Sequence, residues 1–270
     1  MPTISSPNEP PAITRREALR LTLGAAAALI ATSCQSTPIA DAPRAAPGRL
    51  LARPTVPKRG AVIGRSTLGL APGRDGIVYV PSTYSATVPA PLILMLHGAG
   101  QDSEIGIRPF LPLADAAGAI LVAPDSRGRT WDFLYGPYGA DVAFIDRALT
   151  HVFDRCAIDP ARITIEGFSD GASYALSLGI TNGDLFSRIV AFSPCILAPA
   201  ATVGRPRIFI SHGTADQILP IDNCGRRLFA RLTNAGYQVD FHEFHGPHAV
   251  PREVAIAALE WIRQGPGSRS

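Results

Sequence analysis

Residues 162–171 read Arg-Ile-Thr-Ile-Glu-Gly-Phe-Ser-Asp-Gly, and this stretch decides the fold. The β-branched run that ends at Glu166 predicts a short buried strand. Residues 172–178 are small and apolar at helical spacing and predict a helix directly after it. Gly-x-Ser-x-Gly between a strand and a helix is the sequence context of a nucleophile elbow. The two glycines permit a sharp turn in which Ser169 is strained and its hydroxyl points away from the sheet.

Two downstream residues can activate Ser169. Asp216 follows a β-rich run and a His-Gly turn, and His248 lies on a loop containing Gly and Pro, between an expected strand and a final helix. A serine hydroxyl is a weak nucleophile at neutral pH, so an imidazole must take its proton. A carboxylate then fixes the tautomer of that imidazole and stabilises the imidazolium. We expect Ser169, Asp216 and His248 to be the catalytic residues.

Asp222 and His245 are rivals for two of these positions. Asp222 precedes a helical run and fits a helix N-cap better than a catalytic acid. His242, His245 and His248 are spaced three apart, which also suggests a metal site. A strand would place His242 and His245 on opposite faces, however, and a helical His-Glu-x-x-His pattern is absent from the sequence. We therefore expect no metal, and no motif calls for a cofactor.

A loop for an oxyanion hole follows the apolar run 91–96, where the chain reads His97-Gly98-Ala99-Gly100. The backbone N–H groups of Ala99 and Asp170 are the expected donors to the oxyanion, each worth roughly 3–4 kcal/mol. Gly100 is the alternative donor from this loop and a candidate substrate contact. We expect His97 to be structural and to hold the turn by a hydrogen bond.

Residues 91–263 resemble the α/β-hydrolase superfamily. Within it they are similar to the lid-less bacterial esterases of the polyhydroxybutyrate-depolymerase-like and phospholipase/carboxylesterase group. The segments that carry the resemblance are Leu96-His97-Gly98-Ala99-Gly100-Gln101, Ile158-Asp159-Pro160-Ala161-Arg162-Ile163, Gly167-Phe168-Ser169-Asp170-Gly171, His212-Gly213-Thr214-Ala215-Asp216 and Gly246-Pro247-His248.

This resemblance implies ester hydrolysis through an acyl-enzyme, with the catalytic roles carried to Ser169, Asp216 and His248. The expected fold class is α/β, and alternating strand and helix signals indicate a mostly parallel sheet of about eight strands with helices on both faces. One departure is Asp170, where many carboxylesterases of this size have Gln; a carboxylate beside the oxyanion hole would disfavour anionic substrates.

Two loops bear on the substrate. Only eleven residues separate Cys195 from Arg207, too few for a helical cap domain, so the site should be open to solvent. A second loop carries four aromatic residues that could line an acyl or aromatic subsite: Trp131, Phe133, Tyr135 and Tyr138. Trp131 is the first candidate for substrate contact and Tyr135 another. The alternative is ordinary loop packing.

The N-terminal part has the layout of an export signal. An Arg-Arg pair at 15–16 precedes an uncharged run from Leu21 to Ser33, which suggests the twin-arginine route. Cys34 ends a lipobox-like segment and would become a lipidated residue; the alternative is ordinary cleavage with an incidental cysteine. We expect an export signal over 1–34, a Pro/Ala/Arg-rich linker over 35–60 and the catalytic domain over 61–265. The expected location is periplasmic, at the cell surface as a lipoprotein, or secreted.

The charge distribution divides at the same boundary. Residues 1–60 hold eight Lys/Arg and three Asp/Glu, whereas the rest hold 17 and 19. The basicity therefore belongs to the N-terminal part, and the catalytic domain has no electrostatic footprint for nucleic acid.

Three cysteines remain besides Cys34, and outside the cytoplasm two of them would pair. Loops that follow adjacent parallel strands lie close together, which favours Cys195 with Cys224 and leaves Cys156. The sequence alone leaves all three pairings open.

The predicted function is hydrolysis of a small or polymeric carboxylic ester that is short-chain, aromatic or polyester. The alternatives are a catalytically weak extracytoplasmic binding lipoprotein with this fold, or a peptidase. Nothing in the sequence fixes an oligomeric state.

Overall fold

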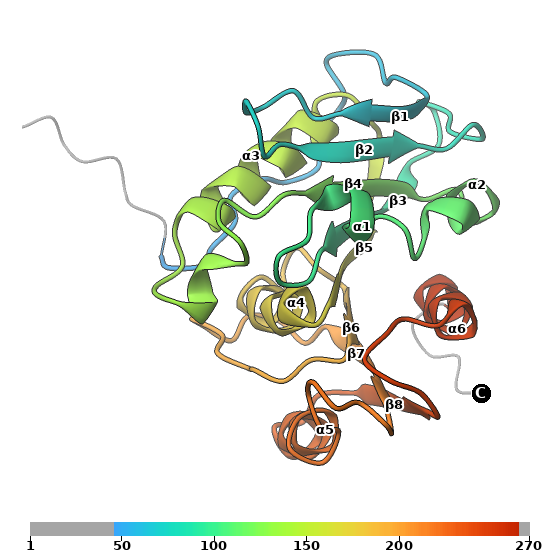
Figure 1. Ribbon diagram of the computed structural model, residues 1–270. Coiled ribbons are helices and arrows are strands. Elements are labelled where there is room, and N and C mark those ends of the chain that lie inside the picture. Colours follow the sequence, from blue (N-terminus) through green and yellow to red (C-terminus); the bar gives the residue numbers. More distant parts are fainter. Residues whose placement is uncertain (1–45, 265–270) are drawn as a thin grey trace, which may run out of the picture. The chain divides into compact units, whose positions relative to one another are not determined.

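A twisted sheet of eight strands lies at the centre of the computed structural model, which describes residues 46–264 (Figure 1). In the spatial order β1-β2-β4-β3-β5-β6-β7-β8, the pairs β1–β2 and β2–β4 are antiparallel and every later pair is parallel. The strands are β1 (Gly64–Thr67), β2 (Gly76–Val80), β3 (Ala90–Leu96), β4 (Ile120–Pro124), β5 (Ile158–Phe168), β6 (Arg188–Phe192), β7 (Arg207–Gly213) and β8 (Val239–Phe244). The prediction of a mostly parallel sheet of about eight strands is confirmed.

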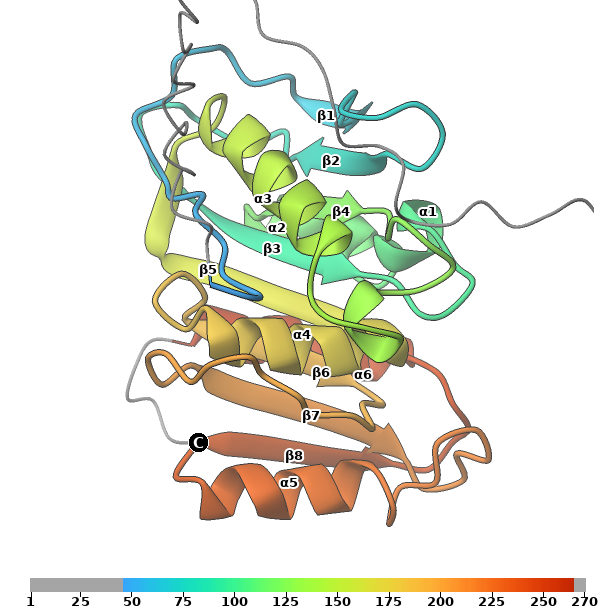
Figure 2. The same ribbon diagram turned by 90° about the vertical axis from the view of Figure 1, so that its left-hand side faces the viewer.

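Helices cover both faces of the sheet. They are α1 (Ser103–Gly106), α2 (Ala114–Ala117), α3 (Ala140–Phe153), α4 (Asp170–Thr181), α5 (Gly225–Asn234) and α6 (Arg252–Arg263), with 3₁₀ turns η1 (Leu111–Leu113) and η2 (Asp132–Leu134). Figure 2 shows α3, α4 and α5 on one face and α6 behind the sheet. Residues of β3 alternate between two apolar cores, Leu92 and Leu94 facing α3 and α4, and Ile93 and Met95 facing α6.

One expected helix, over 103–117, is instead broken into α1, η1 and α2. Pro109 and Pro112 explain the breaks, because proline lacks the N–H that a helix needs and disfavours helical backbone in the residue before it. The breaks leave α1 as one short turn next to the loop that begins at His97.

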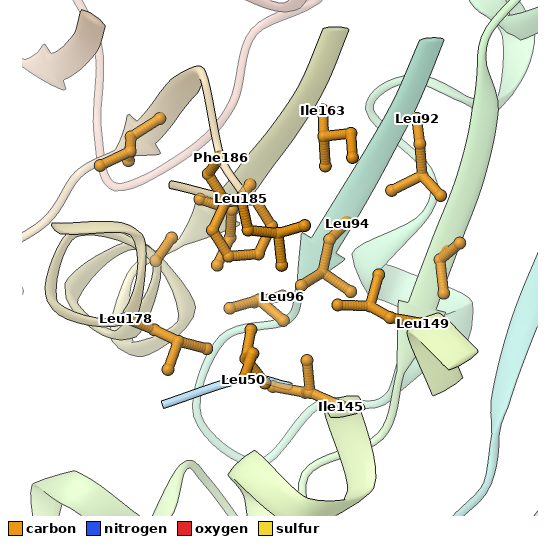
Figure 3. Packing of buried hydrophobic residues seen from close by; sticks show 14 of the residues in the cluster. Leu50, Leu92, Leu94, Leu96, Ile145, Leu149, Ile163, Leu178, Leu185 and Phe186 are labelled. Atoms are coloured by element: carbon orange, nitrogen blue, oxygen red, sulfur yellow. The ribbon is translucent and has the colours of Figure 1, made fainter. Parts of the chain in front are cut away.

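Part of the segment expected to be a linker, residues 35–60, is packed against the folded structure. Residues 46–53, which we call the strap, pack onto α3 and α4 (Figure 3). Leu50 is fully buried near Leu96, Ile145 and Leu178, and its N–H donates to Asn182 Oδ1 (2.8 Å). The folded part of the chain therefore includes residues before 61, which are held by the buried Leu50 and by hydrogen bonds from Arg49 to Asp184 and from the Leu51 N–H to Asp146.

The segment 193–206 between β6 and β7, all of it described, contains no helix. It lies where a cap domain would be inserted, so the expectation of a lid-less architecture holds. Elsewhere in the described chain, no helix combines the length and apolarity needed to cross a membrane.

Candidate active site

Ser169 lies at the turn between β5 and α4 with φ 56° and ψ −117°, a strained conformation for a residue with a side chain. The flanking glycines make this turn possible. A Cβ on Gly167 would overlap the backbone of Gly171, and one on Gly171 would overlap the backbone of Leu96. The elbow predicted from the sequence is therefore present, held at the edge of the sheet where parallel strands end.

The structure brings Ser169, His248 and Asp216 into one hydrogen-bonded chain. His248 Nδ1 lies 2.6 Å from Asp216 Oδ2, and His248 Nε2 lies 2.9 Å from Ser169 Oγ. A carboxylate can only accept, so Nδ1 carries the proton and Nε2 is free to accept the serine proton. This is the tautomer that a general base needs.

Asp216 is held as an anion inside the protein. Burial alone would raise its pKa, but hydrogen bonds from the Leu219 N–H and His248, among others, outweigh burial, and the pKa lies below the ordinary value. The Leu219 and Ile218 N–H groups both donate to Oδ1, at 2.8 and 2.9 Å. Oδ2 is thereby left to face His248.

His212 also contacts this carboxylate, a role that sequence reasoning missed. Its Nε2 lies 2.7 Å from the Leu219 carbonyl oxygen and 3.3 Å from Asp216 Oδ2. Burial lowers the pKa of His212, so the ring is neutral and Nε2 carries the proton that both oxygens accept. The only available signal was its place four residues before Asp216, near the end of β7.

The hydrogen bonds of the described backbone distinguish the expected oxyanion donors. Asp170 is the first residue of α4, where helix N–H groups lack an intrahelical acceptor. Gly100 N–H, by contrast, donates to the Arg129 carbonyl oxygen (2.7 Å), so it is occupied, whereas Ala99 makes no such bond to the described backbone. The geometry therefore favours Ala99 over Gly100 as the donor from the loop. Gly100 is exposed, and its role as a substrate contact stays a prediction.

His97 has the structural role expected of it. Its Nε2 accepts the Ser126 N–H (3.0 Å), so Nδ1 carries the proton and donates to the Gly98 carbonyl oxygen (2.8 Å). Burial lowers the pKa of His97, which keeps this neutral tautomer in place. The Gly98 N–H in turn donates to Gln101 Oε1 (3.0 Å), so both ends of the turn before Ala99 are fixed.

The prediction that Trp131 contacts substrate is wrong. Trp131 is fully buried, donates from Nε1 to the His97 carbonyl oxygen (2.9 Å) and stacks on Tyr174 with ring centroids 5.1 Å apart. Its loop turns inward because the indole can bury its apolar surface and still satisfy its N–H. Trp131 is therefore hydrogen-bonded to the start of the loop that begins at His97. Tyr135 is 83% exposed, and its substrate role remains a prediction.

Asp222 and His245 lie outside the hydrogen-bonded chain. Asp222 does not cap α5, which begins after Cys224; it pairs with Arg226 at the surface, at 2.7 Å. His245 and His242 are exposed. No group of three or more potential metal ligands occurs within residues 46–264.

A disulfide joins Cys195, after β6, to Cys224, at the start of α5. This is the pairing that the order of the strands favoured. Cys156 is free and buried, and burial raises the pKa of its thiol to about 11. The bridge ties together the two loops that lie on either side of β7, the strand that carries Asp216 at its end.

The strand order and the strained turn at Ser169 are those of the α/β-hydrolase fold, and comparison with known proteins shows which families are similar to this chain. Residues 142–264 match the sequence model of the phospholipase/carboxylesterase family. A probable feruloyl esterase C of Aspergillus flavus is 31% identical over 157 residues, covering 55% of this chain and 57% of that protein. Feruloyl esterase C of Emericella nidulans is 30% identical over 158 residues, covering 56% and 57%.

Among solved structures, S-formylglutathione hydrolase from Staphylococcus aureus superposes with a TM-score of 0.59 at 17% identity, over 76% of this chain and 98% of that one. At this identity the likeness concerns the fold. The chain spans a little over half the length of the curated relatives that it matches. The chain therefore has the α/β-hydrolase fold, and its C-terminal half is similar to the phospholipase/carboxylesterase family and to these esterases.

Proposed function

We propose that the chain hydrolyses carboxylic esters through an acyl-enzyme. The observation that carries the proposal is the continuous path Ser169 Oγ–His248–Asp216, with Ser169 strained at the elbow. Backbone strain of this kind is costly and persists where the surroundings enforce it, typically at functional sites. The names of the curated relatives support ester chemistry and favour an aromatic ester over a polyester.

In the proposed reaction the proton moves in a fixed order. Ser169 Oγ attacks the ester carbonyl carbon while His248 Nε2 takes the hydroxyl proton. The Ala99 and Asp170 N–H groups bind the oxyanion. His248 then gives that proton to the leaving alkoxide, and the alcohol departs. Water attacks the acyl-enzyme with His248 again as base, which releases the carboxylic acid and restores Ser169.

Asp170 adds a constraint on this chemistry. Thr130 Oγ1 donates to Asp170 Oδ2 (2.8 Å), so the carboxylate is held in place beside the N–H that would bind the oxyanion. A negative charge there repels an anionic acyl group. Neutral esters are therefore the better substrates of this site.

The location forms part of the same proposal. An Arg-Arg signal and Cys34 would export the domain and anchor it by lipid, and a disulfide between Cys195 and Cys224 suits an oxidising compartment. The export signal and Cys34 lie outside the described residues.

Replacing the nucleophile tests the function. Ser169→Ala should lower turnover of p-nitrophenyl acetate by a factor on the order of 10⁴ or more and abolish labelling by a fluorophosphonate, with an unchanged circular dichroism spectrum. Wild-type protein that neither turns over the ester nor becomes labelled would favour the binding lipoprotein. Cleavage of peptides but not of esters would favour the peptidase.

A further inference from the structure

Glu166 is a buried carboxyl that the proposed mechanism does not use. It lies on β5 three residues before Ser169, in register between Met95 of β3 and Val190 of β6. Glu166 is 1% exposed, and its Oε2 has no hydrogen-bonding partner in the described chain. Burial raises its pKa well above the ordinary value, which favours the neutral acid, a form that can both donate and accept a hydrogen bond. Stability does not explain such a residue, since a buried polar atom without a partner is unfavourable.

A cavity of about 260 Å³ lies against this carboxyl. Glu166 and Leu96 contribute to its wall from the sheet, Ile105 from α1, and His248 and Val250 from the loop before α6. Most of the lining is apolar and includes Phe168, whose ring centroid lies 4.7 Å from that of His248. A space of this size holds about one substituted ring.

The position of His248 shows which half of an ester this cavity can receive. In the proposed reaction the carbonyl oxygen turns toward Ala99 and Asp170, and His248 returns its proton to the oxygen of the leaving alcohol. The group next to His248 is therefore the alcohol half. His248, Ala249 and Val250 all line the cavity, whereas Ser169 and Asp170 do not.

We propose that this cavity binds the alcohol half of the ester, and that Glu166 hydrogen-bonds a hydroxyl group carried on its ring. The inference rests on the proposed ester hydrolysis and adds the chemistry of the leaving group: a phenol or benzyl alcohol with a second hydroxyl. A site with a buried polar group discriminates strongly, because a ligand that lacks the hydroxyl leaves that group unpaired.

Matched acetate esters test the proposal. 4-Hydroxyphenyl acetate and 4-methylphenyl acetate share an acyl group and differ by a hydroxyl in place of a methyl, and their alkaline hydrolysis rates correct for intrinsic reactivity. We expect wild-type kcat/KM to favour the hydroxyl ester by about tenfold or more. Glu166→Leu should bring the ratio to about one, and Glu166→Gln, which keeps a donor and an acceptor, should retain part of it. A ratio near one in the wild type, or an unchanged ratio in Glu166→Leu, would overturn the proposal.

A second pair tests the assignment to the alcohol half. Methyl 4-hydroxybenzoate and methyl 4-methylbenzoate carry the same contrast on the acyl side. We expect no preference that depends on Glu166 for this pair. A Glu166-dependent preference here, and none for the acetates, would contradict the assignment.

If Glu166→Leu does not fold, Ile105→Trp tests the role of the cavity instead. Ile105 is a half-buried residue of α1 that lines the cavity, so the indole would fill it. It should abolish the hydroxyl preference, while Val88→Trp, on an exposed turn before β3, should keep it. An Ile105→Trp protein with the full preference would refute the role of the cavity.

Binding separates this inference from the proposed function. Calorimetry on Ser169→Ala with 4-hydroxybenzyl alcohol and 4-methylbenzyl alcohol should show tighter binding of the first, lost in the double variant with Glu166→Leu. If Ser169→Ala shows this binding but the wild-type protein hydrolyses no ester, the role of the cavity is supported and the proposed hydrolase function is refuted. If the wild-type protein hydrolyses esters but the two alcohols bind equally well, the hydrolase function is supported and the role of the cavity is refuted.

Discussion

Asp216 accepts more hydrogen bonds than the orientation of one imidazole requires. Oδ1 takes two backbone N–H groups, and Oδ2 faces both His248 and His212. His212 makes no hydrogen bond to Ser169 or His248 in the described chain, so its contact with the other two residues runs through Asp216. A carboxylate held from several directions keeps one rotamer, which preserves the short contact with His248.

The acid of the triad can be tested against its rival. Asp216→Asn should lower kcat/KM for p-nitrophenyl acetate by about 10³–10⁴, because an amide in this place favours the wrong imidazole tautomer. Asp222→Asn is the matched control: Asp222 is exposed and pairs with Arg226, and such pairs contribute about 1 kcal/mol or less. A larger loss in Asp222→Asn than in Asp216→Asn would reassign the acid.

Among the elements, the strap shows most clearly what a sequence pattern conceals. Its composition is that of a linker, yet Leu50 is fully buried between α3 and α4, and Leu51 is 68% exposed. The difference between these neighbours arises from tertiary contacts with Asn182 and Asp146, more than 90 residues away in the chain. The composition of residues 46–53 alone does not predict such contacts.

Two leucine variants measure how much the packing of the strap contributes to the free energy of unfolding. Leu50→Ala should lower the free energy of unfolding by about 2–4 kcal/mol, because it removes buried methyl groups from a packed core. Leu51→Ala should change it by less than about 0.5 kcal/mol. Urea unfolding followed by circular dichroism gives both values, and equal effects would mean that the strap does not dock in solution.

The strap also contains a charge interaction that depends on pH. Hydrogen bonds from Arg49 lower the pKa of Asp184, with burial opposing them and Arg53 adding to them. A carboxyl whose pKa is lower in the folded state stabilises the protein at pH values above the ordinary pKa of that carboxyl, which is 3.8 for Asp184. This contribution is lost as the pH falls toward the pKa in the folded state.

We therefore expect Asp184→Asn to be destabilising at about pH 6, by about 1 kcal/mol or less because the pair is partly exposed, and less so at about pH 3. Urea titrations at the two pH values check this. A difference between wild type and variant that grows on acidification would contradict the sign.

At the scale of the whole molecule, features fixed by short motifs were predictable, and those fixed by packing were not. The elbow, the order Ser169, Asp216, His248 and the parallel sheet follow from strand patterns and glycine spacing, which are local. Trp131 was misassigned because an aromatic residue on a loop can turn toward solvent or into the core, and only its neighbours decide. The pattern of strand residues predicted that Glu166 lies in a strand. It could not predict that the carboxyl has no hydrogen-bonding partner, because alternation gives only the face on which a side chain lies.

The disulfide illustrates an intermediate case. The sequence left three pairings open, but the order of strands in a parallel sheet brings the loops after β6 and β7 together at one edge, which favours Cys195 and Cys224. Topology inferred from local patterns can therefore restrict long-range contacts even where it does not determine them.

The open architecture predicts a preference for short acyl chains. An acyl chain gains about 0.8 kcal/mol per methylene only where protein removes it from water. The segment 193–206 forms no helix, so little protein is available to cover a chain beyond its first carbons. Across p-nitrophenyl esters from acetate to palmitate, kcat/KM should peak at about two to six acyl carbons and fall beyond. Higher kcat/KM for palmitate than for butyrate, or a sharp rise when the substrate forms an interface, would instead require a covered acyl groove and would refute the open site.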